Sequence, residues 1–77
     1  MNKINCYIYT PYIQLDQLLK YSGIIQTGGE IKNLFETKNI LVNDIKCTEK
    51  RKKIYPGYKI KINSELEIIV LFEENRL

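Results

Sequence analysis

The chain has 77 residues, of which 44% are hydrophobic and 27% charged, an ordinary composition for a globular protein. A chain of this length buries only about 60% of its unfolded surface, which excludes a binding domain joined to a separate catalytic one. The net charge is +3, but residues 1–63 carry 11 basic and 5 acidic side chains, and residues 64–77 carry 1 and 4. A basic body favours a polyanion as partner, although a merely solubilising surface would have the same charge.

Two cysteines, Cys6 and Cys47, stand 41 positions apart, and there is no histidine. Without a Cys-x-x-Cys motif we expect neither a metal nor another cofactor. General base catalysis would require a perturbed Asp, Glu, Lys or Cys, so we expect no enzyme. The absence of a secretory signal and of any membrane-length apolar run favours a cytoplasmic protein with two buried reduced thiols. A single disulfide is the alternative.

The first predicted strand covers residues 6–13 (CYIYTPYI), which are rich in β-branched and aromatic types. Pro11 near its end suits a strand at the edge of a sheet. Residues 15–23 (LDQLLKYSG) then predict an amphipathic helix, because the leucines recur at helical spacing. Gly23 fits the left-handed residue that ends many helices.

The segment TGGEIKNLF, residues 27–35, predicts a second helix that begins with a capping box formed by Thr27 and Glu30. Gly28 and Gly29 fall in its first turn, where they would either expose amides to an anion or let the two helices pack closely. The segment is not a nucleotide-binding P-loop, because the longer glycine spacing and the Lys-Ser or Lys-Thr pair are absent. The predicted inward stripe of this helix is Ile31, Leu34 and Phe35.

The second half of the chain predicts only strands and turns. In order, these are a hairpin at 40–47 turning at Asn43-Asp44, a polar run at 48–53 (TEKRKK), a turn at Pro56-Gly57, and strands at 58–62 and 66–72. The predicted fold class is therefore α+β, with two helices packed on a small, mostly antiparallel sheet of four to five short strands.

The order and spacing of these pieces from residue 15 to residue 62 resemble the S-four domain, which is the alpha-L RNA-binding motif. The chain is most similar to the small stand-alone YaaA-type proteins, through YIQLDQLLK, QTGGEIKNLF, ILVND and KRKKIYPGYKIKI. The resemblance implies one S-four-like domain over residues 1–77, with its core motif at 15–62, that binds structured RNA without catalysis. The implied RNA is ribosomal or transfer RNA, and the ribosome is a candidate partner. Where many relatives have arginines at the start of the second helix, this chain has Gly28, Gly29 and Glu30, and Asp44 replaces the hairpin glycine.

Four adjacent cations are the strongest candidates for RNA contact. They are Lys50, Arg51, Lys52 and Lys53. Because like charges repel, folding gains nothing from this arrangement, whereas phosphates would relieve the repulsion and release counterions. The alternative is a solvated loop. Further candidate RNA-binding residues are Lys32, Gly28, Gly29, Lys46, Lys59 and Tyr55, the last by stacking on an unpaired base.

A second function fits the apolar strands. An exposed sheet edge can pair with another chain, so the protein would instead be a protein-interaction or dimerisation module. We expect a monomer rather than a dimer.

Overall fold

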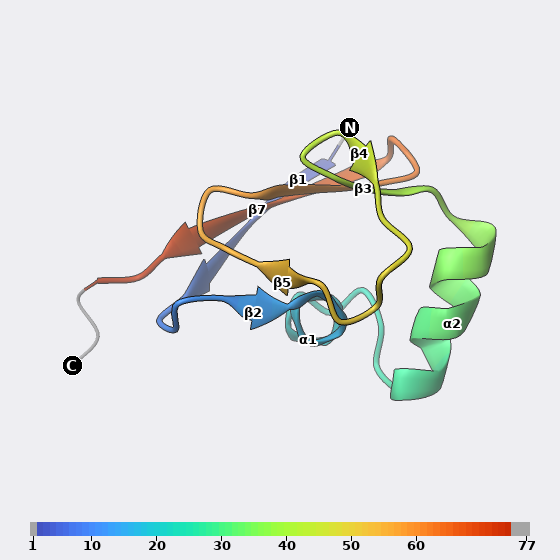
Figure 1. Cartoon of the computed structure of the whole chain (residues 1–77), viewed down its shortest axis with the longest axis horizontal. Coiled ribbons are helices and arrows are strands. Elements are labelled where there is room, and N and C mark those ends of the chain that lie inside the picture. Colours follow the sequence, from blue (N-terminus) through green and yellow to red (C-terminus); the bar gives the residue numbers. More distant parts are fainter. Residues whose placement is uncertain (1, 75–77) are drawn as a thin grey trace.

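The computed structural model describes residues 2–74, which form two helices, a five-stranded sheet and a two-stranded ribbon (Figure 1). The elements in chain order are β1 (Asn2–Ile8), β2 (Ile13–Gln14), α1 (Leu15–Tyr21), α2 (Gly28–Thr37), β3 (Ile40–Val42), β4 (Ile45–Lys46), β5 (Lys53–Ile54), β6 (Lys59–Ile62) and β7 (Leu66–Phe72). The five-stranded sheet has the order β1-β7-β6-β3-β4. Only the β1–β7 pair is parallel, so the predicted α+β class with a mostly antiparallel sheet is confirmed.

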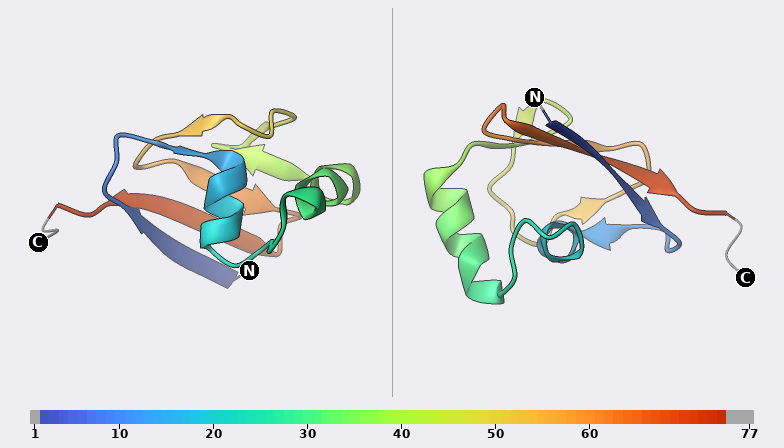
Figure 2. Two further views of the ribbon diagram at one scale, coloured as in Figure 1. Left: turned by 90° about the horizontal axis from the view of Figure 1, so that it is seen from below. Right: turned by 180° about the vertical axis from the view of Figure 1, so that it is seen from behind.

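The molecule has two layers around one core. The five-stranded sheet forms one layer, and α1 lies under it beside the β2–β5 ribbon, while α2 stands at the end of the molecule (Figures 1 and 2). Side chains at alternate strand positions point into the space between the layers. The largest fully buried side chains there are Leu15, Leu18, Leu19, Ile40, Ile54, Ile60, Ile68 and Val70. Neither helix within residues 2–74 is long and apolar enough to cross a membrane.

The corner after α1 is a Schellman motif, which confirms the predicted helix end. Gly23 has a φ of +81°, and its amide donates to the carbonyl of Lys20 at 3.0 Å. The amide of Ile24 donates to the carbonyl of Leu19, also at 3.0 Å. Ile25 then enters the core, so this corner sets the direction in which the chain approaches α2.

Gly23 and Gly29 are expected to respond in opposite ways to alanine. Gly23→Ala should cost about 1 kcal/mol, because a Cβ at Gly23 would meet no atom within 4 Å and only the left-handed backbone opposes it. Gly29→Ala should stabilise by up to about 1 kcal/mol, because Gly29 lies in a helix and its surroundings are equally open. Urea unfolding of both variants measures the difference, and a shift of both in the same direction would contradict it.

The predicted first strand is displaced along the chain. The structure places β1 at Asn2–Ile8, and Pro11 lies in the connection to β2 rather than in a strand. Residues 2–5 (NKIN) have little intrinsic strand preference, but their pairing with the strongly apolar β7 overrides it. The expected edge position is confirmed, since β1 ends the sheet.

The predicted capping box at the start of α2 is wrong. Thr27 is the N-cap residue, but the two expected capping hydrogen bonds are not the ones that form. The Thr27 side chain makes no capping hydrogen bond. The Glu30 carboxylate accepts a hydrogen bond from the amide of Gln26 at 3.2 Å, not from the amide of Thr27. Either contact keeps the carboxylate at the positive end of the helix, so the dipole does not select between them.

The predicted turns and buried thiols are confirmed. Asn43-Asp44 has two successive positive φ values, as a tight hairpin requires, and so does Asn63-Ser64 between β6 and β7. Gly57 has a φ of +95° after Pro56. Cys6 and Cys47 are buried and free, and burial raises the pKa of the Cys6 thiol.

Candidate nucleic-acid interface

Main-chain hydrogen bonds hold the basic segment, residues 50–53, against the first turn of α1. The amide of Leu15 donates to the carbonyl of Lys52 at 2.9 Å, and the amide of Asp16 donates to the carbonyl of Lys50 at 3.0 Å. First-turn amides have no acceptor within their own helix, and α1 has no side-chain cap. The basic segment supplies that cap, so its backbone follows a fixed path.

The four side chains of the basic segment do not form one patch. Lys50 and Arg51 line a depression beside the two helices. Lys52 is half-buried and lines a different depression, of about 300 Å³, next to the β3–β4 hairpin. The Lys53 ammonium lies 5.0 Å from the ring centre of Tyr12. Although the four residues are adjacent in the sequence, their charges therefore do not all lie side by side in the structure.

Cations from four parts of the chain gather around α2. One depression of about 360 Å³ lies between α1, the start of α2 and the basic segment. Another of about 260 Å³ lies between α2 and the segment that follows β4, and Lys50 lines both. We call the cations that line these two depressions the α2 rim: Lys20, Lys32, Lys38, Lys46, Lys50 and Arg51.

The α2 rim carries an excess of positive charge. Its six cations share the two depressions with two carboxylates, those of Asp16 and Glu36. Arg51 Nε lies 4.0 Å from Asp16 Oδ2, at the limit of an ion pair. Within residues 2–74 the other five cations of the rim take part in no ion pair. Their charges are left for solvent or for an external anion.

Of the two glycines of α2, Gly28 lies at this rim, and Gly29 follows it in the first turn of the helix. A Cβ added to Gly28 would lie 4.0 Å from the Lys20 ammonium, and Gly28 lines the larger depression. Gly28 and Gly29 are the first two residues of α2, where amides lack helical acceptors. No atom lies within 4 Å of a Cβ added to Gly29, so close packing of the two helices does not require a glycine there.

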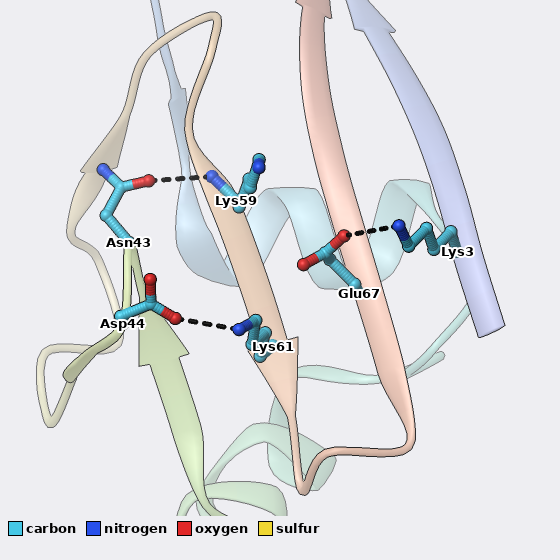
Figure 3. A network of polar contacts seen from close by, with 6 residues as sticks. All are labelled: Lys3, Asn43, Asp44, Lys59, Lys61 and Glu67. Carbon is cyan, nitrogen blue, oxygen red and sulfur yellow. Dashed lines mark hydrogen bonds and ion pairs between the residues drawn. The ribbon is translucent and has the colours of Figure 1, made fainter. Parts of the chain in front are cut away.

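The outer face of the sheet carries a separate set of charges, most of them paired (Figure 3). Lys59 and Lys61 alternate with buried isoleucines and so point away from the helices. Lys61 Nζ lies 2.8 Å from Asp44 Oδ1, and Lys3 Nζ lies 3.9 Å from Glu67 Oε2 (Figure 3). The candidate Lys59 therefore lies on a different face from the α2 rim.

The pair of Asp44 and Lys61 is expected to make the stability of the hairpin depend on pH. The hydrogen bond and charge of Lys61 lower the pKa of Asp44 below its ordinary value of 3.8. A lowered carboxyl pKa stabilises the fold above 3.8, and this contribution is lost as the pH falls through the lowered value. Asp44→Asn should therefore reduce the unfolding free energy slightly at pH 7 and not at all in strong acid. Urea unfolding at several pH values checks this, and a difference that grows in acid would contradict it.

Two members of the α2 rim could not be singled out from the sequence. Lys38 directly follows α2, and Lys20 lies in the last turn of α1, so neither belongs to the basic run. Helical spacing was the only signal available. It does not reveal that the corner at Gly23 brings the end of α1 beside the start of α2, which places Lys20 next to Gly28.

The candidate Tyr55 lies outside the α2 rim. It directly follows β5, so it stands at the end of the β2–β5 ribbon, and 41% of its surface is exposed. Lys53 precedes it on the same short strand. The basic segment therefore runs from the α2 rim, at Lys50, to the ribbon, at Lys53.

Two helices on a small sheet, bordered by a rim of mostly unpaired cations, define a class of small α+β modules typical of nucleic-acid-binding proteins. The sequence profile described as S4 domain matches residues 6–70, and the chain belongs to the S4 domain family, which is an RNA-binding family. The resemblance to the S-four domain is thereby confirmed. A similar protein is the "Probable ribosome maturation protein RlbA" of Bacillus subtilis (strain 168). It is 36% identical over 55 residues, which are 71% of this chain and 78% of the relative.

Proposed function

We propose that the protein is a non-catalytic module that binds structured RNA through the α2 rim and the basic segment. The observation that carries the proposal is the gathering of six cations around α2, five of them without an ion pair within the described residues. Such a surface costs electrostatic free energy until phosphates neutralise it. The S4 domain family supports RNA as the ligand, and the relative named for ribosome maturation favours ribosomal RNA over transfer RNA.

The proposed contacts follow the two depressions along α2. Lys50 lines both, so a phosphate near it would have cations on either side, with Lys20 and Arg51 toward α1 and Lys32 in the middle of α2. The free amides of Gly28 and Gly29 would add donors at the positive end of the helix dipole. These contacts reach phosphates rather than base edges. They would therefore select RNA by its shape, and they would fix the position of the RNA on the protein.

The salt dependence of binding tests the proposal. If about four phosphates are neutralised, a plot of log K against log salt concentration should have a slope near −3. Filter binding of a structured ribosomal RNA fragment at several salt concentrations gives the slope directly. A slope near zero would rule out a phosphate interface, whatever the affinity.

The open edge of β1 favours pairing with another protein as a second candidate function. The amide of Asn2 donates to the carbonyl of Glu65 at 2.9 Å, and the amide of Glu73 donates to the carbonyl of Ile8 at 2.7 Å. With the parallel register of β1 and β7, these two bonds place the even-numbered residues of β1 toward β7. The odd-numbered residues 3, 5 and 7 therefore present their amides and carbonyls at the edge, where a further strand can add. A salt-independent dimer without nucleic-acid absorbance on size-exclusion chromatography would favour this function, and a monomer that copurifies with RNA would favour the first.

A further inference from the structure

A group of aromatic side chains occupies one face of the β2–β5 ribbon. The antiparallel register pairs Gln14 with Lys53, and its continuation places Tyr12 opposite Tyr55. The ring centres of Tyr12 and Tyr55 lie 5.6 Å apart, and the Lys53 ammonium lies 5.0 Å from the ring centre of Tyr12. The register thus explains why two rings and one cation meet on the same face.

The ring of Tyr55 contacts two other aromatic rings. Beyond the Pro56-Gly57 turn, Tyr58 returns with its ring centre 5.8 Å from that of Tyr55. The amide of Tyr58 donates to the carbonyl of Tyr55 at 3.1 Å, which fixes the turn. The rings of Tyr12 and Tyr58 are tilted by 45° and 55° to that of Tyr55, so neither lies flat on it. Tyr55 is therefore oriented by its neighbours and yet keeps 41% of its surface exposed.

Lys53 is the cation that lies beside this aromatic face, over the ring of Tyr12. Within the described residues, neither Lys52 nor Lys53 takes part in an ion pair. Lys53 covers the ring of Tyr12, which leaves Tyr55 as the more accessible ring of the group. An oriented aromatic ring near an ammonium group that has no carboxylate partner within the described residues matches the chemistry of a nucleotide, which has a flat base and a charged phosphate.

We propose that Tyr55 is a stacking site for one unpaired base of the bound RNA, with Lys53 beside it at the flanking phosphate. This inference rests on the proposed function and deepens it, because it names the RNA class as a helix interrupted by an unpaired nucleotide. The basic segment runs from the α2 rim to Tyr55. The rim would hold the paired part by its phosphates, and the ribbon would hold the base that leaves the helix.

Packing alone accounts less well for these features. A ring needed only for the core would be buried, as the preceding residue Ile54 is, whereas Tyr55 is exposed. Stacking by tyrosine tolerates any base, since every base has a flat aromatic face. The site would therefore distinguish unpaired from paired nucleotides without selecting a sequence.

Two RNA hairpins that differ only by a single bulged 2-aminopurine test the proposal. The wild-type protein should bind the bulged hairpin about tenfold more tightly than the fully paired one, and binding should quench the fluorescence of the 2-aminopurine. Tyr55→Leu, which keeps an apolar side chain but no aromatic ring, should bind both hairpins equally. Tyr55→Phe should keep the preference and the quenching.

The outcomes separate this inference from the proposed function. Equal binding of the two hairpins by the wild type, or an unchanged preference in Tyr55→Leu, would overturn the stacking site and leave the phosphate interface intact. Failure to bind either hairpin at low salt would overturn both. Circular dichroism melting of Tyr55→Leu checks its folding. If that variant is unfolded, Tyr55→Ile takes its place and must lose both the quenching and the preference. The wild type must likewise show no preference for a hairpin with a bulged abasic site over the paired hairpin.

Discussion

Neutralising Lys32, Lys50 and Arg51 together to Gln is expected to weaken binding to structured RNA by about a hundredfold at low salt. Each of these side chains would contribute one charge-assisted hydrogen bond to a phosphate, and Lys50 lies where the two depressions beside α2 meet. The slope of log K against log salt should also become less negative by about one for each phosphate that is no longer neutralised. Filter binding of the wild type and the triple variant across a salt series measures both effects.

The matched control is a second triple variant with the same change of net charge. Lys3, Lys59 and Lys61 lie on strands whose exposed face points away from the helices, and two of them are already paired with carboxylates (Figure 3). Their replacement by Gln should weaken binding less than tenfold, because only long-range attraction is reduced. An equal loss of affinity in the two triple variants would mean that net charge, not the α2 rim, determines the affinity.

Ile60→Ala is expected to cost about 2–5 kcal/mol of unfolding free energy, the range for truncating a fully buried aliphatic side chain. Ile60 lies in β6, which is flanked by β3 and β7, and it is completely buried. Small domains have about 0.05–0.15 kcal/mol of stability per residue, so this loss is a large part of the total for such a chain. Urea unfolding followed by circular dichroism measures it.

Ile45→Ala provides the same chemical change at an exposed place. Ile45 lies in the edge strand β4 and is 72% exposed. Its truncation should change the unfolding free energy by less than about 0.5 kcal/mol. If Ile60→Ala and Ile45→Ala lost comparable amounts of unfolding free energy, the core would not be centred between the sheet and α1.

The features predicted correctly from the sequence are those that neighbouring residues determine. Asn43-Asp44 and Gly57 specify their turns because few other residues accept a positive φ. The leucines of α1 and the alternation in β6 encode buried faces by periodicity. The β2–β5 ribbon was missed because its strands have two residues each, too few to show any period.

The candidate site was predictable only in part, because it depends on contacts between distant segments. The basic run at 50–53 was visible, but its side chains separate according to how the main chain is tied to α1. Lys59 was placed on a strand from the sequence, but alternation sends its side chain outward with Lys61, away from the α2 rim. The cations of the α2 rim come from α1, α2, β4 and the basic segment. No local sequence pattern predicts that these segments lie close together.

The hydrogen bonds from Leu15 and Asp16 to the basic segment have a consequence for the thermodynamics of RNA binding. Fixing the backbone of one residue costs about 1–2 kcal/mol of conformational entropy, and here folding has already fixed the backbone around Lys50 and Lys52. RNA would need to immobilise only side chains, so more of the contact energy would remain as affinity. If RNA binds the segment in this tethered form, binding and the integrity of α1 are linked. Saturating RNA should raise the melting temperature, and variants that fray the start of α1 should bind more weakly while keeping every positive charge.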